Sequence, residues 1–541
     1  MSSHSIRHVD DSSQVVVHDV ALDAQERRRR ALAEIDNAKF GWFHIRACIV
    51  SGIGFFTDAY DLFIINLVVQ MLGYVYFADN KNVVPSSIDL GLKVSASIGT
   101  FIGQIFFGYL ADRLGRKKMY GIELMMIVVF TITSAFAANA VRGITATTMI
   151  MIWRFLLGIG VGGDYPLSAV ITSEFATTKR RGAMIAAVFA MQGFGILSAA
   201  IVSTVTVVAF QNAINEDVMA FDYVWRICVG VGAIPGLVAI YFRLTIPETP
   251  RYTMDINKDL SKATKDIGNV LNLDAKAHGA DAVAAAQAAE HHAQAVPKAS
   301  WSDFRRHFSQ WPNLKVLVGT SMTWFALDVA FYGTGLNNAI ILTAMGYVDK
   351  SSPYRDLYTA SVGNIIIAML GTVPGYWVTV FTVDRMGRKT IQLMGFTVLT
   401  VLFLIMGIGF NAIRDYSIVL FTVIFTLTQF FQNWGPNSTT FIVPGEVFPT
   451  RYRSTAHGIS AAMGKLGAIV AQVGFSQLKD IGGKGEFVPE LIIIFAVFMF
   501  IGLLFTFFIP ETAGKTLEEL SGEDDYAARR TGADDAVMQE V

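Results

Sequence analysis

The chain has 541 residues, of which 53% are hydrophobic and 16% are charged, and its formal net charge is −1 at pH 7. Soluble proteins carry about a quarter charged residues, so this composition indicates an integral membrane protein. The net charge argues against nucleic acid as a partner, because the chain has no basic surplus to neutralise phosphates.

The N-terminal stretch is polar and carries Arg27 to Arg30 without an apolar core, so we do not expect a cleaved secretory signal. About twelve apolar runs follow, each long enough to span a bilayer as a helix. The expected spans are 44–75, 93–112, 119–139, 147–174, 183–210 and 223–246, and then 313–347, 357–383, 390–411, 417–443, 455–479 and 487–509. These runs predict an all-α membrane protein with five parts: a tail (1–42), a six-helix bundle (43–247), a linker (248–312), a second six-helix bundle (313–510) and a tail (511–541).

The short loops after spans 2, 4, 8 and 10 predict the orientation. They read "ADRLGRKK", "TTKRR", "DRMGRK" and "PTRYR", and they hold more Lys and Arg than the loops on the opposite side. By the positive-inside rule these loops are cytoplasmic. We therefore expect both termini and the linker to be cytoplasmic as well.

Within the linker, "ADAVAAAQAAEHHAQAVPKAS" is rich in alanine and low in complexity, which is typical of a nascent helix or of disorder. His291 and His292 lie in it without further metal ligands nearby, so we interpret them as solvated. The later segment "SWSDFRRHF" predicts an interfacial helix whose Trp301, Phe304 and Phe308 enter the membrane surface.

Two loop phrases occur once in each half. "GYLADRLGRKK" (108–118) matches "TVDRMGRKT" (382–390), and "IPETPRY" (246–252) matches "IPETAGKTLEEL" (509–520). Twelve spans with matched loops resemble the major facilitator superfamily. That resemblance implies two pseudo-symmetric halves with a substrate site at the membrane midplane between them. It also implies a charge latch that gates the cytoplasmic face, formed by Asp112, Arg113 and Arg116 and by Asp384, Arg385 and Arg388.

Three further stretches narrow the family. "GGDYPLSAVITSE" (162–174), "WFALDVAFYG" (324–333) and "FFQNWGPNSTTFIVPGEVFPTRYRSTAHGISAAMGK" (430–465) resemble the inorganic phosphate:proton symporters of fungi and plants, most closely the high-affinity fungal members. The resemblance covers nearly all of both membrane halves. It implies a secondary active transporter in the plasma membrane that imports phosphate with protons by alternating access. It implies no cofactor, and arsenate is an expected isosteric substrate.

Span 7 carries the candidate substrate stripe. Trp324, Asp328 and Tyr332 lie at i, i+4 and i+8, so they share one helix face. Dihydrogen phosphate presents hydroxyls and bare oxygens, and these side chains offer both acceptors and donors, although a carboxylate could equally bind sugar hydroxyls. The resemblance assigns phosphate binding to Tyr165, Gln192, Trp324, Asp328, Tyr332, Asn433 and Lys465.

Three alternatives stay open for these polar residues. Trp324 could serve packing, Lys465 could pair with an acidic side chain instead of the anion, and Asn437 could satisfy backbone freed by Pro436. The glycine-rich approach to Asp164 is followed by Pro166, which predicts an unwound turn.

Acidic residues at membrane depth are functional candidates. Asp58 and Asp61 are three residues apart on one helix face, and two carboxylates so close cannot both ionise cheaply. The resemblance assigns proton coupling to Asp58, Asp61, Asp164 and Asp328. The alternatives are helix capping for the pair in span 1 and a salt bridge with a buried Arg or Lys for Asp164.

Two more charged residues fall inside expected spans. For Glu123 and Arg154 we favour gating over ligand binding, and Arg154 could also extend to an interface.

Rival functions remain. A sugar:proton symporter shares the loop phrases, but span 7 lacks the Gln-Gln…Asn pattern of sugar porters. A phosphate sensor would carry longer cytoplasmic extensions. An enzyme is not expected, because no strand precedes the glycine runs and no Gly-Lys-Ser follows them. Cys48 and Cys228 both lie in apolar runs, so we expect neither a disulfide framework nor a metal site.

Overall fold

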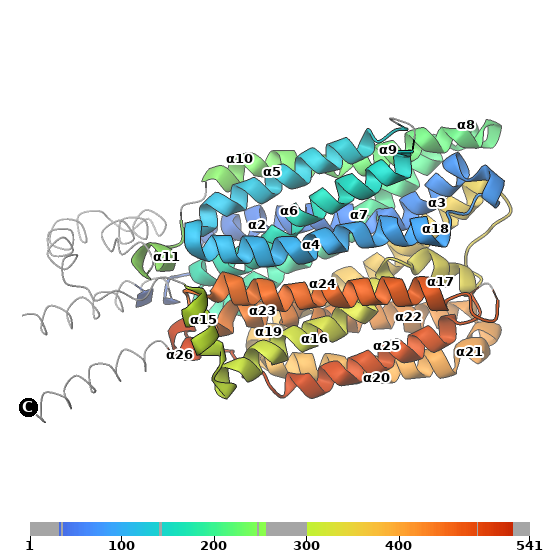
Figure 1. Cartoon of the computed structure of the whole chain (residues 1–541). Helices are drawn as coiled ribbons and strands as arrows, with labels where there is room; N and C mark the ends of the chain where they lie inside the picture. Colours follow the sequence, from blue (N-terminus) through green and yellow to red (C-terminus); the bar gives the residue numbers. More distant parts are fainter. Residues whose placement is uncertain are drawn as a thin grey trace, which may run out of the picture.

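The computed structural model describes residues 32–33, 36–139, 143–245, 248–255, 300–483 and 485–522. Within these ranges, twelve helices are long and apolar enough to cross a membrane, as the sequence predicted. Arg27 to Arg30, His291 and His292 lie outside the described residues. In Figure 1 the first half, blue to green, lies above the second half, yellow to red.

Each half contributes six crossings. In the first half they are α2 (Trp42–Phe63) with α3 (Ile65–Tyr76), α4 (Ser86–Leu114), α5 (Arg116–Ala135), α6 (Ala146–Phe175), α7 (Arg181–Ala209), and α9 (Phe221–Val231) with α10 (Ala233–Thr245). In the second half they are α16 (Trp311–Gly335), α18 (Pro353–Ile367) with the π-helical turn η4 (Ala368–Thr372) and α19 (Val373–Met386), α20 (Arg388–Ile408), α22 (Ile418–Asn433) with α23 (Pro436–Val447), α24 (Arg453–Leu478) and α25 (Val488–Thr506).

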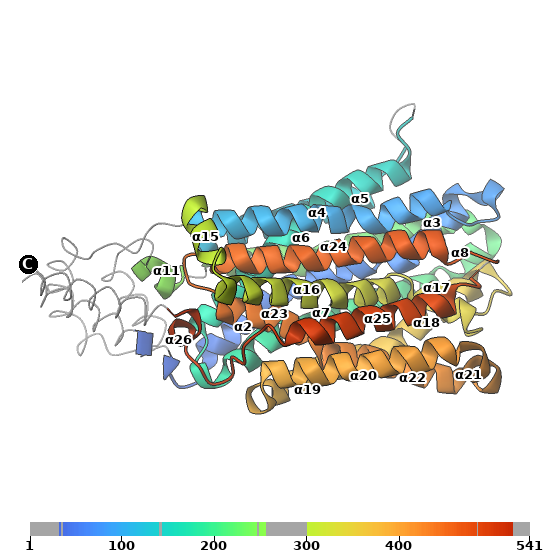
Figure 2. The same cartoon turned by 60° about the horizontal axis from the view of Figure 1, so that its bottom comes forward.

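The halves meet along two seams. One joins α4 to α24, which lie side by side in Figures 1 and 2, and the other joins α7 to α18 and α19. The short helices α11 (Pro250–Asp255), α15 (Trp301–Phe308) and α26 (Leu517–Ser521) gather at one end of the bundle, on the left in both figures. We call this the linker end and the opposite end the far end.

Proline has different effects in spans 4 and 10. The unwound turn predicted at Pro166 is wrong, because α6 continues through it. The break occurs instead before Pro436, where α22 ends at Asn433. Hydroxyls of Thr379 and Ser438 donate to the freed carbonyl of Asn433, each at 2.8 Å. In a membrane interior such freed backbone groups need a protein partner, and these side chains supply it.

Helix α15 corrects a second prediction. Phe304 and Phe308 do not point into a membrane surface; they are buried against Phe448 and Tyr452 of the loop that precedes α24. Of the three aromatic residues in that prediction, Trp301 alone is exposed. The two phenylalanines bury apolar area by packing on the protein itself, so α15 covers the linker end of the second half.

Candidate transport site

The charge in the middle of span 7 has a buried partner. Lys465 Nζ donates to Asp328 Oδ2 at 2.9 Å and to the Tyr332 hydroxyl at 2.8 Å. All three side chains are at least 98% buried. The pairing left open for Lys465 is therefore the one observed, and it offsets the cost of a carboxylate in an apolar setting.

Aromatic rings surround this ion pair. Lys465 Nζ lies 4.2 Å from the ring centroid of Tyr332 and 4.9 Å from that of Tyr165, within the range of cation–π attraction. Tyr165 comes from α6, so the first half also reaches Lys465. Gly464 permits the close approach of α24 to α16, because a Cβ atom there would lie 2.5 Å from the Trp324 ring.

A chain of amides and hydroxyls continues from Tyr165 into the second half. Gln192 Nε2 donates to the Tyr165 hydroxyl at 3.3 Å, and the Tyr376 hydroxyl donates to Gln192 Oε1 at 3.4 Å. Asn437 Nδ2 donates to the Tyr376 hydroxyl and to Asn433 Oδ1, both at 2.7 Å. Asn437 thus belongs to this network and does not satisfy freed backbone. Sequence reasoning missed Tyr376, whose only signal was a hydroxyl beside "VPG" in span 8.

The structure brings all seven predicted phosphate ligands into one buried region between the halves. The first half supplies two of them and the second half five: Tyr165 and Gln192, then Trp324, Asp328, Tyr332, Asn433 and Lys465. Together they present an ammonium, hydroxyls, amides, an indole N–H and a carboxylate. Such a mixture of donors and acceptors suits a partly protonated oxyanion.

Asp164 pairs with a cation that the sequence analysis did not single out. Arg243 Nη2 donates to Asp164 Oδ2 at 2.7 Å, while its Nη1 contacts Glu123, and the Ser168 hydroxyl also donates to Asp164. Arg243, Glu123 and Asp164 are fully buried within the first half. The salt-bridge alternative for Asp164 is thus the observed arrangement. The available signal was an arginine late in span 6, in "YFRLT".

The two aspartates of span 1 differ in their surroundings. Neither carboxylate oxygen of Asp58 has a hydrogen-bond partner among the described residues, although the side chain is fully buried. Asp61 accepts from the Thr131 hydroxyl at 2.5 Å. Arg154 donates to the backbone carbonyl of Asp61 at 2.9 Å and is 5% exposed, so it does not extend to an interface. Glu123 and Arg154 both bond within the first half.

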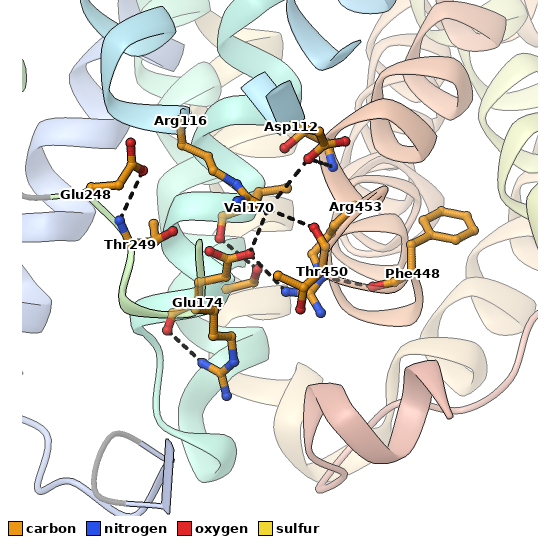
Figure 3. A network of polar contacts seen from close by, with 12 residues as sticks. Asp112, Arg116, Val170, Glu174, Glu248, Thr249, Phe448, Thr450 and Arg453 are labelled. Atoms are coloured by element: carbon orange, nitrogen blue, oxygen red, sulfur yellow. Dashed lines mark hydrogen bonds and ion pairs between the residues drawn. The ribbon is translucent and has the colours of Figure 1, made fainter. Parts of the chain in front are cut away.

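The first copy of the repeated loop crosses to the second half at the linker end. The Asp112 carboxylate accepts from the backbone N and the hydroxyl of Thr455, both at 2.7 Å, in the first turn of α24. Arg116 lies 3.5 Å from Asp112 and 3.3 Å from Glu174, and it donates to the Thr450 carbonyl at 2.9 Å (Figure 3). Glu174 also pairs with Arg453 at 3.0 Å.

The second copy makes the reciprocal crossing. Asp384 accepts from the backbone N of Gly182 at 3.2 Å and of Ala183 at 2.9 Å, in the first turn of α7. Arg388 pairs with Asp384 and Glu446, each at 2.9 Å. Each loop aspartate therefore caps a helix N-terminus of the opposite half, where a carboxylate is favoured by the helix dipole.

Two residues predicted for the latch lie outside it. Arg113 is exposed and donates to Tyr109 on its own helix at 2.7 Å, and Arg385 is exposed. Their gating role therefore stays a prediction, since both side chains are exposed in this structure. Glu174 and Glu446 were missed, although each ends its span at matching places, in "ITSEF" and "VPGEVF".

The second repeated phrase also joins the halves. Arg251 from "PETPRY" pairs with Glu518 from "PETAGKTLEEL" at 2.9 Å. Burial alone would raise the pKa of Glu518, but Arg251 outweighs it and lowers the pKa to about 2. Arg181 donates to the Lys515 carbonyl at 2.9 Å. In this structure the linker end is thus held closed by several cross-half contacts.

Comparison with known proteins identifies the family. The model of the family described as "Sugar (and other) transporter" matches residues 47–523. The repressible high-affinity phosphate permease of Neurospora crassa is 49% identical over 537 residues, covering 96% of this chain and 93% of that protein. The inorganic phosphate transporter PHO84 of Saccharomyces cerevisiae is 46% identical over 524 residues, covering 92% and 88%.

Solved structures match the fold. The major facilitator superfamily proton:xylose symporter XylE aligns with a TM-score of 0.68 at 21% identity, covering 88% of this chain and 98% of that one. These matches agree with the predicted fold and with the expectation of a transporter and not an enzyme. The chain is an integral membrane protein that belongs to the sugar (and other) transporter family of the major facilitator superfamily, and within it to the inorganic phosphate transporters.

Proposed function

We propose that this chain imports inorganic phosphate together with protons by alternating access, with the region around Lys465 as the substrate site. The observation that carries the proposal is the buried pair of Lys465 and Asp328, which faces Tyr165 of the opposite half. Two relatives more than 45% identical are named as phosphate transporters, which favours this substrate over a sugar.

The pair explains how a proton and an anion can be coupled. Dihydrogen phosphate and the ionised Asp328 compete for the single ammonium group of Lys465. Protonation of Asp328 removes the competitor and turns the carboxyl into a donor toward a phosphate oxygen. Loss of that proton restores the competition and expels the phosphate. Tyr332, Tyr165, Gln192, Trp324 and Asn433 then supply the remaining hydrogen bonds.

Proton coupling also offsets the cost of moving an anion against the membrane potential. Moving one negative charge inward against an inside-negative potential costs about 2.3 kcal/mol per 100 mV. One proton taken with one dihydrogen phosphate makes the step neutral, and two make it inward-driven. Asp58 and Asp61 lie on the same span as candidate carriers of the further proton, while Asp164 is held by Arg243.

The contacts between the halves at the linker end form the cytoplasmic gate. The linker end faces the cytoplasmic side of the plasma membrane, because its loops carry more Lys and Arg than the loops at the far end. Asp112 and Asp384 cap helices across the seams, so release of these caps opens the site toward the cytoplasm. The linker and both tails are then cytoplasmic.

The test is flux in proteoliposomes that contain the purified chain, with an imposed inward proton gradient. We expect radiolabelled phosphate to accumulate, a protonophore to abolish the accumulation, and arsenate to compete where glucose and xylose do not. Proton-driven accumulation of a hexose or pentose would favour the sugar symporter instead. Phosphate binding without flux would favour a sensor.

A further inference from the structure

A cavity with a mainly apolar lining and several amide side chains lies between the halves on the far-end side of Lys465. It is lined from the first half by Phe63 and Asn66, and from the second half by Asn338, Asn364 and Gln429 among others. All the residues that line it are uncharged. The mechanism proposed above uses none of these amides.

The cavity lies on the path into the central site. Gly335 at its wall follows Asp328 by about two turns of α16, a rise of roughly 10 Å toward the far end. Between the two regions, the Phe63 ring stacks on the Tyr332 ring with centroids 5.5 Å apart and an interplanar angle of 17°. A solute that entered from the far end would reach the cavity first and would pass this stack to reach Lys465.

The amides in the cavity form an incomplete network. Asn364 Oδ1 accepts from Asn338 Nδ2 at 3.2 Å and, across the seam, from Asn66 Nδ2 at 3.5 Å. Asn338 Oδ1 has no hydrogen-bond partner among the described residues, although Asn338 is only 8% exposed. A buried carbonyl oxygen left without a donor is costly. The cavity therefore favours a ligand that can donate a hydrogen bond at this point.

We propose that this cavity is an outer phosphate position, at which dihydrogen phosphate binds before it reaches Lys465; the inference rests on the proposed function. A phosphate hydroxyl donates to Asn338 Oδ1, and the bare oxygens accept from amide N–H groups of Asn66 and Gln429. Because the site offers no cation, it binds the anion weakly and releases it readily, as an entry position requires. The long bond between Asn66 and Asn364 is one of the contacts across the seam that open to admit it. Two others join Tyr74 to Asp356 and Lys93 to Asn337, each at 2.9 Å.

The test is phosphate uptake by proteoliposomes containing the full chain with Asn338→Leu or the isosteric Asn338→Asp. We expect KM to rise about tenfold for the leucine variant and further for the aspartate, which repels the anion, with kcat within twofold of the unsubstituted chain. Ile196→Leu, on the wall of the same cavity, is the matched control and keeps both constants. A lowered kcat at unchanged KM in both Asn338 variants would assign the residue to packing and overturn the proposal.

A binding measurement separates this inference from the proposed function. Lys465→Gln removes the ammonium group of the central site, and the detergent-solubilised variant should still bind radiolabelled phosphate weakly, with that binding lost when Asn338→Leu is added. Complete loss of binding in Lys465→Gln alone would refute the outer position. Absence of phosphate flux in the unsubstituted chain would instead refute the proposed function.

Discussion

A single methyl group at position 54 should test the buried charge cluster of the first half. Gly54 lies in α2 against the pair of Arg243 and Asp164. A Cβ atom there would lie 2.8 Å from Cζ of Arg243 and closer still to its Nη2 and to Oδ2 of Asp164. Gly54→Ala therefore cannot be accommodated unless the guanidinium moves.

The cost of that movement follows from the neighbours of Arg243. Its guanidinium is held between Glu123 and Asp164 and lies 4.0 Å from the centroid of the Tyr120 ring, all in a fully buried setting. Breaking a buried ion pair costs about 3–5 kcal/mol, because a charge is left without compensation. Alanine favours a helix over glycine by about 1 kcal/mol. We therefore expect Gly54→Ala to lower the free energy of unfolding by about 2–4 kcal/mol.

The measurement is unfolding of the purified protein in mixed micelles by titration with dodecyl sulfate, followed by tryptophan fluorescence. Gly474→Ala is the matched control, since Gly474 lies inside α24 and a Cβ atom there meets nothing within 4 Å. The control should be unchanged or slightly stabilised. If the two variants unfold at the same denaturant concentration, the reasoning about Arg243 is refuted.

Three further predictions concern the site, the gate and helix α15. Asp328→Asn should reduce proton-driven phosphate uptake to background, because the amide cannot exchange a proton; full concentrative uptake would contradict the coupling. Asp112→Ala or Asp384→Ala should each remove a helix cap worth about 1 kcal/mol. A cysteine placed in the central site of either variant should then react several-fold faster with a thiol reagent added at the linker end. An unchanged reaction rate would exclude a gating role. Burial of His307 lowers its pKa from 6.5 to about 4, and the positive charge of the nearby Arg451 contributes to this shift. Acid therefore weakens docking of α15 as the pH falls from 6.5 toward 4, and hydrogen exchange of α15 should rise over this interval but not in His307→Gln.

The sequence by itself determined the number of spans, the two-fold repeat and the central stripe. Apolar length and loop phrases are local properties, so twelve crossings and matched loops could be read directly from the chain. Helical periodicity alone placed Asp328 and Tyr332 on one face, and both contact Lys465. The family resemblance supplied the remaining ligand residues, and the structure brings them together.

Only the tertiary structure decided which charges meet. Asp164 and Arg243 are far apart in the chain, and hydropathy does not encode the rotation of each helix about its axis that brings them within 2.7 Å. The same holds for Asp112, whose carboxylate caps a helix of the other half. For the prolines, the sequence predicted an unwound turn at Pro166, whereas the structure has its break before Pro436. Packing decided where the break lies, because the hydroxyls of Thr379 and Ser438 donate to the carbonyl freed in span 10, while α6 remains a continuous helix.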